Sequence, residues 1–555
     1  MTESVPIATN GNIPDGYEVI VEGQASMLYE KKEAVFYNKV QVLNRDTSIQ
    51  TIRLFAEQRI KEKNEKMAKN HPDHPKCEGI RVLDALAATG LRSIRYLKEI
   101  PGVSHVTIND LLPEATTQAL ENCKRNNVDE SRVTINTGDA IMYMYNHREH
   151  EEQYDVIDLD PYGSASPFID SAVQAVADGG LLCVTCTDMP VLSGNYPETC
   201  FAKYGTVSIK AGYHAEHALR TLLQTIDTAA NKYARYIVPY VSLAIDFYCR
   251  VFVRVFKSPA EVKKSCTKRA MVLQSTQCPT YYLQPLATES TQSKKRNKAK
   301  AKAKAKAEAS GESSTPPPPN TNIQYTNAHM TVPTVCEETG GRLKIAGPFW
   351  SAPLHDMVIV NELLRRLEAN ESEGLLPFPV PTKPRLTGLL TAVSEELNDV
   401  PFYTSLSDLC STMNCKGMPM IEMKAALINA GYRVSNFHKD PIAIKTDAPN
   451  GVLWDIMRAF VKKSTDDGVS KKKKLQASSV IILEKKNNTD IEVDFTIPEC
   501  LLGEKKKALR FPPNPEANWG PKRRAGRPPV AEEESKQASD KGSSPVSKKM
   551  KKDDI

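Results

Sequence analysis

The stretch DVIDLDPYGSAS, residues 155–166, has side chains that could hold an amino group still. A strand-like run ends here at Asp160, and Pro161, Tyr162 and a glycine follow. A carboxylate and a free backbone carbonyl can accept the two N–H bonds of an exocyclic amine on a nucleobase, while a flat ring stacks on the base. An ordinary buried strand that ends in a type I turn would carry the same residues. The stretch alone predicts either an amine-binding site or a structural turn.

Acidic residues end five successive strand-like runs in this region, and their shared position favours a binding site. They are Asp84, Asp110, Asp139, Asp160 and Asp188. Open α/β sheets bind ligands at the carboxyl ends of their strands, and an acid at the end of the second strand accepts hydrogen bonds from ribose hydroxyls. Asp110 has that position, and Asp139 with Ala140 could meet an adenine amino group. A single Asp after a strand is more often a helix cap or a turn former.

The loop ALAATG after the first of these strands could let a ligand approach the backbone. It has one glycine, Gly90, where a dinucleotide-binding fingerprint would have three, so a dinucleotide is disfavoured. Its small side chains still allow a close approach, and a ligand without a pyrophosphate needs no full anion cradle. We therefore include Asp84, which ends the strand, and Gly90 among the residues expected to bind a nucleoside cofactor.

Alternating strands and helices must position these groups. From Ile80 the chain reads as five strands joined by helices, which are IRVLDAL, HVTINDL, RVTINT, DVIDLD and GGLLCVTCT. Parallel strands need a crossover, and the predicted helix from Leu91 supplies the first one. Two strands rich in β-branched and aromatic residues close the series within residues 236–257. We therefore expect an α/β fold with the seven-stranded, Rossmann-like sheet of nucleoside-dependent methyltransferases, whose last strand pair is antiparallel.

A predicted amphipathic helix precedes the first of these strands. Its apolar residues recur at near-helical spacing from Ile49 to Ile60, and Asp46 or Thr47 could cap its start. Arg45, beside that cap, is a candidate contact for an anion or a carboxylate. A solvated surface position is the commoner fate of an isolated arginine.

The bulk composition indicates an intracellular protein with a polyanionic partner. The 555 residues are enough for two or three domains, and no run of about 18 apolar residues could span a membrane. The N-terminus shows neither a secretory signal nor a clear mitochondrial one. Twelve scattered cysteines are typical of reduced core thiols, so disulfides are not expected. The net charge is only +6, but Lys and Arg cluster in runs, which favours a polyanion.

Composition divides the chain into four regions. We expect a flexible N-terminus at 1–16, a catalytic domain at 17–257, a smaller α+β C-terminal domain at 258–512 that binds the polyanion, and a disordered basic tail at 513–555. Residues 288–322, rich in Lys, Ala, Ser and Pro, are expected to be a disordered insertion. Helical runs and a strand within residues 382–435 resemble a winged-helix module, which is used often but not only for nucleic acid.

Cysteine spacing does not supply a metal site. Cys278 and Cys336 stand in STQCPTYY and TVCEETGG, so neither belongs to a CxxC pair, and four zinc ligands cannot be assembled locally. His329 and His355 could lend ligands, but free thiols are the favoured interpretation. We expect no bound metal.

Several motifs together resemble one enzyme family. They are VLDALAATGLRSIRYLKEIPG, VIDLDPYGSASPFIDSAVQAVADGGLLCVTCTDM, ETCFAKYG, GPFWSAPLHD, KTDAPNGVLWDIMR and NPEANWGP. The family they resemble is the tRNA (guanine-26) N2-dimethyltransferases, which are class I S-adenosylmethionine-dependent methyltransferases. The resemblance runs from Asn44 to about residue 521, and DLDPYGS followed by GGLLCVTCTDM is much narrower than a generic methyltransferase signature.

The resemblance implies an enzyme that transfers one or two methyl groups from S-adenosylmethionine to the exocyclic N2 amine of guanine 26 in tRNA. By position in the matching motifs, the S-adenosylmethionine pocket would be lined by Arg45, Arg92, Asp110, Asp139 and Ala140, and the guanine would be held by Asp160, Pro161 and Tyr162. Asp158 should share the face of Asp160 but lie deeper, as support. Many members have paired cysteines that form a zinc site near Cys278 and Cys336, and the lost partners here argue against zinc.

Two other functions stay open at this stage. An acidic-Pro-aromatic motif at a strand end also serves other nucleobase amines, such as adenine N6. The chain could instead be a non-catalytic RNA-binding protein that works through its basic insertion and tail. The expected partners are tRNA and S-adenosylmethionine, with no membrane, and we expect a monomer. Basic clusters near the C-terminus favour the nucleus, and the N-terminus leaves a mitochondrial location open.

Overall fold

The computed structural model describes eight stretches of the chain. They are residues 16–30, 37–70, 75–291, 323–369, 373–466, 476–489, 491–503 and 509–511. The expected tail at 513–555 and nearly all of the expected flexible N-terminus lie outside them, as do residues 292–322 of the expected insertion. Residues 288–291 of that insertion are described, and they belong to a strand.

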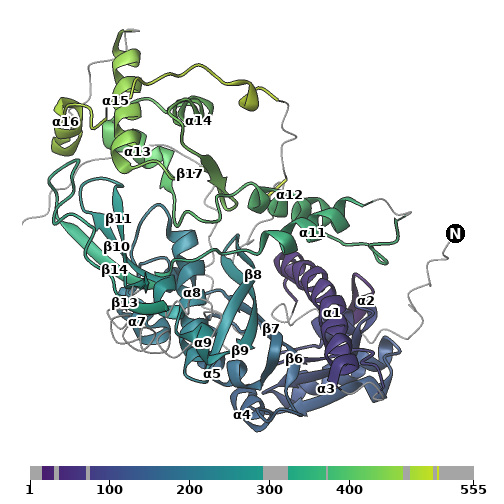
Figure 1. Ribbon diagram of the computed structural model, residues 1–555. Coiled ribbons are helices and arrows are strands. Elements are labelled where there is room, and N and C mark those ends of the chain that lie inside the picture. Colours follow the sequence, from purple (N-terminus) through teal and green to yellow (C-terminus); the bar gives the residue numbers. More distant parts are fainter. Residues whose placement is uncertain are drawn as a thin grey trace, which may run out of the picture.

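A seven-stranded sheet is the centre of the fold, in the strand order β5-β4-β3-β6-β7-β9-β8 (Figure 1). Its strands are β3 (Ile80–Asp84), β4 (Val103–Asp110), β5 (Val133–Thr137), β6 (Tyr154–Leu159), β7 (Val176–Cys186), β8 (Arg235–Ile245) and β9 (Tyr248–Lys257). Strands β3 to β7 pair in parallel, and β9 is antiparallel to both β7 and β8. The predicted α/β fold with its antiparallel closing pair is therefore confirmed.

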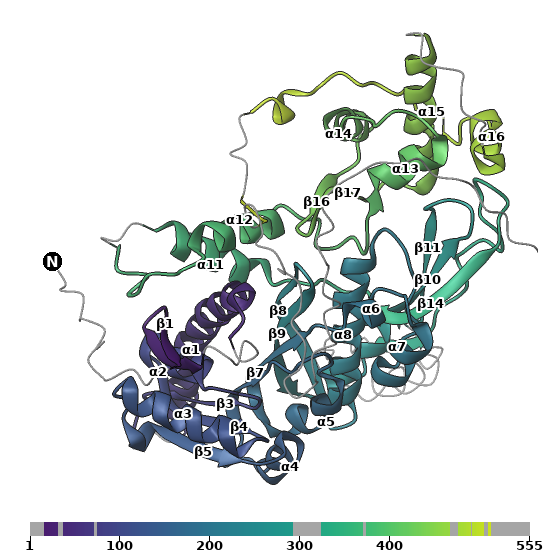
Figure 2. The same ribbon diagram turned by 180° about the vertical axis from the view of Figure 1, so that it is seen from behind.

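Helices cover both faces of this sheet (Figures 1 and 2). One face packs on α4 (Ala140–Asn146), α5 (Ser166–Ala175) and α8 (His214–Asn231), and the other packs on α1 (Val42–Asn70), α2 (Leu91–Glu99) and α3 (Pro113–Arg125). Ile157 and Leu159 of β6 join the first core, whereas Val156 joins the second. Because side chains alternate along a strand, Asp158 lies on the face of Val156, toward α1 and α2.

The first helix begins earlier than the sequence predicts. A hairpin of β1 (Tyr17–Glu22) and β2 (Ala25–Glu30) precedes it, and α1 starts at Val42, so the expected cap at Asp46 or Thr47 is wrong. Asp46 and Thr47 instead lie within α1, and both residues are buried. Asp46 pairs with Arg95 of α2, and the Thr47 hydroxyl donates to the carbonyl of Leu43. Asp46 therefore makes a contact with a distant helix and Thr47 makes a contact within α1, and neither caps the first turn.

Beyond β9 the chain adds a three-stranded sheet, a two-stranded sheet and two helices. They are β10 (Arg269–Ser275) between β11 (Tyr281–Pro285) and β14 (Leu343–Trp350), the pair β12 (Ala287–Thr291) and β13 (Ile323–Asn327), then α11 (Met357–Glu368) and α12 (Lys383–Ser394). Strands β10 and β14 share the core of the α8 face, and α11 and α12 share the core of the α1 face.

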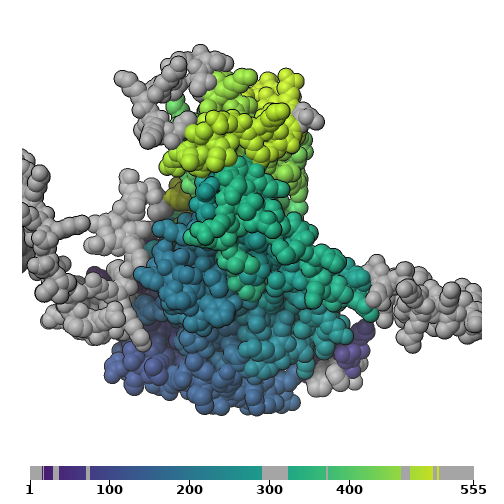
Figure 3. All heavy atoms as spheres, turned by 90° about the vertical axis from the view of Figure 1, so that its left-hand side faces the viewer, coloured from purple at the N-terminus to yellow at the C-terminus, as the bar shows by residue number. Residues whose placement is uncertain are grey.

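The last described elements form a C-terminal body, which lies above the large sheet in Figure 1 and at the top of the described chain in Figure 3, in light green and yellow. It contains β15 (Thr404–Ser405), α13 (Leu406–Met413), α14 (Met420–Asn429), β16 (Val434–Phe437), β17 (Asp440–Thr446), α15 (Asn450–Asp466) and α16 (Ala477–Glu484). It has a core of its own, centred on residues such as Leu409, Met423 and Trp454. The expected smaller α+β part is thus present.

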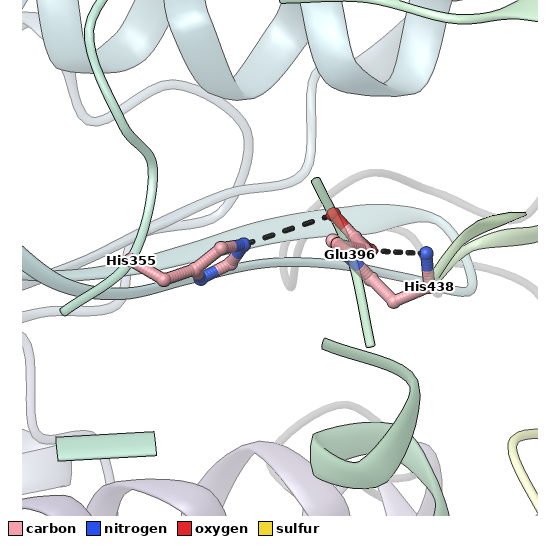
Figure 4. Close-up of side chains that lie close together, drawn as sticks. All are labelled: His355, Glu396 and His438. Atoms are coloured by element: carbon pink, nitrogen blue, oxygen red, sulfur yellow. Dashed lines mark hydrogen bonds and ion pairs between the residues drawn. The ribbon is translucent and has the colours of Figure 1, made fainter. Parts of the chain in front are cut away.

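A buried His-Glu-His group joins this part of the chain to β8 (Figure 4). The backbone N–H groups of Ser242 and Ala244 donate to His355 Nδ1, at 3.3 Å, and to His438 Nε2, at 2.9 Å. The remaining ring nitrogens face Glu396, whose oxygens lie 4.0 Å from His355 Nε2 and 2.7 Å from His438 Nδ1.

The same hydrogen bonds decide what this group can hold. Within the described stretches it is the one group of three or more His, Cys, Asp or Glu side chains close enough together for a metal ion. A metal-bound imidazole normally donates its second N–H to an acceptor. Here a backbone donor, from Ser242 or Ala244, points at the second nitrogen of each ring. The geometry therefore favours neutral histidines, with His438 contacting Glu396, and it argues against a metal centre at this group.

Acid should destabilise the protein through this group. Burial, reinforced by the nearby His438, lowers the pKa of His355 well below its ordinary value. The unfolded chain therefore binds a proton that the folded chain does not, and stability that is complete at neutral pH falls once the pH drops below about 6.5. We expect a loss of about 1.4 kcal/mol per pH unit from His355 alone.

The measurement is the free energy of unfolding from denaturant titrations between pH 7.5 and 5.5. His355→Asn should be less stable at neutral pH but should flatten the slope, and the matched change at exposed His150 should leave the slope as it is. An equal slope in wild type and His355→Asn would contradict this assignment.

Candidate active site at the carboxyl edge of the sheet

The candidate site lies where the strand order reverses. From β3 the chain moves outward through β4 to β5, and then it returns to β6 on the other side of β3. Ligands of open α/β sheets bind in the crevice outside the carboxyl ends of the strands at such a point. Gly90 follows β3, Asp110 ends β4 and Asp160 follows β6. The fold thus brings these predicted residues to one edge.

Asp160 is held by Arg92, at the start of α2. One Nη of Arg92 donates to Asp160, and the other donates to Ser48 Oγ at 3.0 Å and to Asp158 at 3.4 Å. Burial would lower the pKa of Arg92, but the charges of Asp160 and Asp158 outweigh it and raise the pKa well above its ordinary value. The Asp160 side chain keeps 22% of its surface exposed while that of Asp158 is fully buried. Asp160 is therefore the carboxylate that faces the crevice.

Asp158 is the centre of a buried charge network. Arg250 of β9 donates to its two oxygens at 2.7 and 2.9 Å, and the hydroxyl of Tyr96 also donates to it. Burial would raise the pKa of Asp158, but Arg250 and Arg92 lower it below its usual value, so the group stays ionised. The sequence prediction that Asp158 supports its neighbour agrees with this geometry.

Arg250 and Tyr96 are site residues that the sequence reading missed. Arg250 is fully buried in the apolar run YCRVFVRVF. Arg is almost never fully buried without a partner, so an arginine inside a predicted core strand was the available signal. The identity of the partner could not be read, because 92 residues separate Arg250 from Asp158.

Asp84 and Gly90 shape the loop behind the crevice. Asp84 is buried and accepts a hydrogen bond of 2.7 Å from Ser93. Burial and the nearby charge of Asp158 raise its pKa to about 7. Gly90 has φ +74°, and a Cβ there would come within 3.0 Å of the side chain of Ala119. Glycine is therefore required by the backbone itself, in addition to any ligand.

Asp110 and Asp139 have structural partners and also reach the edge. The Asp110 carboxylate accepts from the backbone N–H of Ala88 at 2.9 Å and of Leu112 at 3.1 Å, which ties the loops after β3 and β4 together. Asp139 is exposed and caps α4 through a bond of 2.8 Å to the N–H of Ile141. Ala140, next to it, is buried.

Arg45 does not lie on the solvated surface. Its guanidinium makes a two-pronged contact with Glu22 of β1, at 2.6 and 2.5 Å, and it is 8% exposed. The ring of Tyr37 lies 5.5 Å from its guanidinium carbon. The predicted contact of Arg45 with a carboxylate is therefore present, and its partner is Glu22. The alternative prediction, a solvated surface arginine, is wrong.

Pro161 and Tyr162 open the loop after Asp160. Pro161 is buried and Tyr162 is 56% exposed. Partial burial, together with the charges of Asp160 and Asp110, raises the pKa of Tyr162. Thr187, after β7, makes two hydrogen bonds of 2.8 Å with Gly163. Its hydroxyl accepts from the Gly163 N–H, and its own N–H donates to the Gly163 carbonyl, which fixes the loop after Asp160.

Known proteins resemble this chain in sequence and in fold. The sequence profile of a family described as N2,N2-dimethylguanosine tRNA methyltransferase matches residues 16–458. Relatives named tRNA (guanine(26)-N(2))-dimethyltransferase include one from Mus musculus, 39% identical over 92% of this chain and 77% of its own, and one from Schizosaccharomyces pombe, 38% identical over 93% and 94%. A Saccharomyces cerevisiae relative, whose name adds the word mitochondrial, is 34% identical over 92% and 93%.

A solved structure agrees with the architecture. Trm1 from Pyrococcus horikoshii, in complex with S-adenosyl-L-methionine, has a TM-score of 0.60 at 24% identity and covers 79% of this chain and 99% of its own. At that identity the likeness supports the fold, whereas the sequence profile and the relatives identify the family. The chain belongs to the N2,N2-dimethylguanosine tRNA methyltransferase family.

Proposed function

We propose that this chain transfers methyl groups from S-adenosylmethionine to the exocyclic N2 amine of guanine 26 in tRNA. Family membership supports the reaction, and one geometric observation supports the site, namely a partly exposed carboxylate followed by a buried proline and an exposed aromatic ring at the reversal point of the sheet. S-adenosylmethionine supplies the electrophilic methyl group when it is bound.

The residues at the edge fit a nucleoside cofactor. Asp110 has the position at which an acid accepts ribose hydroxyls, and it is held in place by the two backbone N–H groups described above. Asp139 and Ala140 start α4 at the neighbouring strand end, and the loop at Gly90 leaves its backbone open to close approach. Arg92 holds Asp160 from the start of α2, the helix that follows the Gly90 loop.

Asp160 has the main part in the proposed mechanism. The lone pair of the guanine amine is delocalised into the ring, so the site must orient the amine and stabilise the positive charge that grows on nitrogen. The carboxylate of Asp160 and the backbone carbonyl beside Pro161 accept the two N–H bonds, and Tyr162 stacks on the base. The contact with Arg92 fixes the position of the Asp160 carboxylate, so we assign to Asp160 the orientation of the amine and the stabilisation of its charge. The base must leave its stack to arrive there.

The partner and location follow from the same evidence. We propose tRNA and S-adenosylmethionine as the substrates of a monomer, in the nucleus with a share in mitochondria. The basic clusters of the sequence favour the nucleus, and the yeast relative whose name includes the word mitochondrial favours a share in mitochondria. None of the helices that the structure describes is long and apolar enough to cross a membrane.

The reaction is tested by mass spectrometry of nucleosides after the protein is incubated with unmodified tRNA and S-adenosylmethionine. We expect N2-methylguanosine and N2,N2-dimethylguanosine, and neither should form on a tRNA with adenine at position 26. Methylation of adenine in DNA under the same conditions would favour the alternative amine, and no methylation of any nucleic acid would favour a binding protein.

Asp160→Ala should abolish methyl transfer while S-adenosylmethionine binding stays nearly intact. Loss of the group that orients the amine and stabilises its charge should lower kcat by about a hundredfold or more, by comparison with the loss of an oxyanion donor. Methyl transfer from labelled S-adenosylmethionine and calorimetric binding of the cofactor measure the two properties. Asp178→Ala, at the opposite edge of the sheet, is the matched control, and full activity of Asp160→Ala would remove Asp160 from the mechanism.

The ring of Tyr162 should matter more than its hydroxyl. Stacking of a base on an aromatic ring contributes about 1–3 kcal/mol. Tyr162→Ala should therefore lower kcat/KM for tRNA by about 5- to 150-fold, whereas Tyr162→Phe should stay close to wild type. Steady-state kinetics with varied tRNA separate the two variants, and equal losses in both would assign the role to the hydroxyl.

A further inference from the structure

Two thiols lie in contact where the turn after β10 meets the turn before β14. Cys278 Sγ and Cys336 Sγ are 3.6 Å apart, and both residues are buried. A disulfide needs its sulfur atoms about 2.05 Å apart, so movements that bring them about 1.5 Å closer would allow a bond. The two residues are 58 positions apart in sequence, and the turns that carry them face each other.

Each cysteine has a hydroxyl residue three positions away, which is Ser275 for Cys278 and Thr339 for Cys336. A second cysteine at each of these positions would complete a zinc-binding CxxC turn. Ser275 Oγ lies 3.4 Å from Cys278 Sγ, and the hydroxyls of Ser275 and Thr339 both hydrogen-bond to Cys336. Two facing CxxC turns would offer four sulfur ligands to zinc, but here two of the four positions hold neutral hydroxyls. The remaining pair of thiols is therefore better placed to react with each other than to hold a metal.

The surroundings stabilise the reactive form of one sulfur. A hydrogen bond from Cys278 outweighs burial and lowers the pKa of Cys336 below its ordinary value, with help from Thr339, Ser275 and the N–H of Glu338. The same bond, with burial, raises the pKa of Cys278. The thiolate is the form that attacks in disulfide formation, so the pair combines an attacking group with a partner in contact.

A cavity gives small molecules access to Cys278, one thiol of this pair. It has a volume of about 350 Å³ and reaches Cys278. Its other walls come from the loop before α8, with Lys210 and Tyr213, and from the start of the C-terminal body, with Tyr403 and Asp408. An oxidant of the size of hydrogen peroxide fits this space, whereas a protein does not.

We propose that Cys278 and Cys336 form a reversible disulfide when the protein meets a peroxide. The oxidant converts one thiol to a sulfenic acid and releases water. The other sulfur then attacks the oxidised sulfur, the S–S bond forms, and the hydroxyl leaves with a proton as a second water. Two thiols and one peroxide thus give one disulfide and two waters, and a dithiol reductant reverses the step. In the structure both thiols are free, as the sequence analysis expects, and the proposal concerns the protein after oxidation.

The disulfide would stabilise the surface against which the C-terminal body packs. Thr280, in the turn of Cys278, accepts a hydrogen bond of 2.8 Å from the indole of Trp454 in α15, and Asn450 donates to the carbonyl of Tyr281 at 2.9 Å. Both thiols also belong to the core of that body. A covalent link between the two turns therefore fixes the surface on which α15 rests, independently of the catalytic chemistry.

The test treats the native, full-length protein with increasing hydrogen peroxide, blocks free thiols with iodoacetamide, and maps linked peptides by mass spectrometry. We expect the peptide pair joining Cys278 to Cys336 at peroxide levels at least tenfold below those that oxidise exposed Cys266, and its loss after dithiothreitol. Oxidised wild type should also unfold at a higher temperature than reduced wild type, a shift that Cys336→Ser removes and Cys266→Ser keeps.

Two results would overturn the proposal. One is that Cys278 and Cys336 stay alkylatable at peroxide levels that oxidise Cys266. The other is one equivalent of zinc in the purified protein that shields both thiols until a chelator removes it. The linked peptide is sought in the wild-type protein, so neither result depends on the folding of a variant.

Discussion

The structure depends on the buried negative charge of Asp158. Its carboxylate has no access to solvent, so it must be neutralised inside the protein. Arg250 provides the main partner, and removing one member of such a buried pair typically costs about 3–5 kcal/mol. Because β6, β9 and α2 each contribute a member, the three elements are fixed relative to each other. Arg92 contacts both Asp158 and Asp160, so the position of the exposed carboxylate follows from that of the buried one.

The strand-end acids show how a structural role and a binding role can occupy one side chain. Asp139 caps a helix and Asp110 ties two loops, as the general preference of Asp for such positions predicts. Each carboxylate has about four acceptor sites, and the backbone contacts use only part of them. The choice between a cap and a ligand contact is therefore not exclusive, and capping holds these groups at the edge where a cofactor would meet them.

The sequence predicted the sheet and its edge well because the signals are local. Short apolar runs bounded by turns defined β3 to β9, and the residue after each strand then had to lie at the carboxyl edge. The predicted start of α1 was wrong, because Asp46 is a residue type that often caps helices but here contacts Arg95 of α2. Likewise, Arg45 meets Glu22 of β1, a strand whose pairing does not follow from the periodicity of α1. Contacts between distant segments were the part that residue patterns could not supply.

The histidines on β8 have a consequence for how the protein behaves in a crowded solution. β8 is an edge of the large sheet, and an edge strand offers unpaired backbone groups to any other strand. The N–H groups of Ser242 and Ala244 are already taken by the rings of His355 and His438. Side chains from later in the chain thus take the place of an eighth strand. This part of the edge is therefore closed to another strand by the two histidines, of which His438 belongs to the C-terminal body.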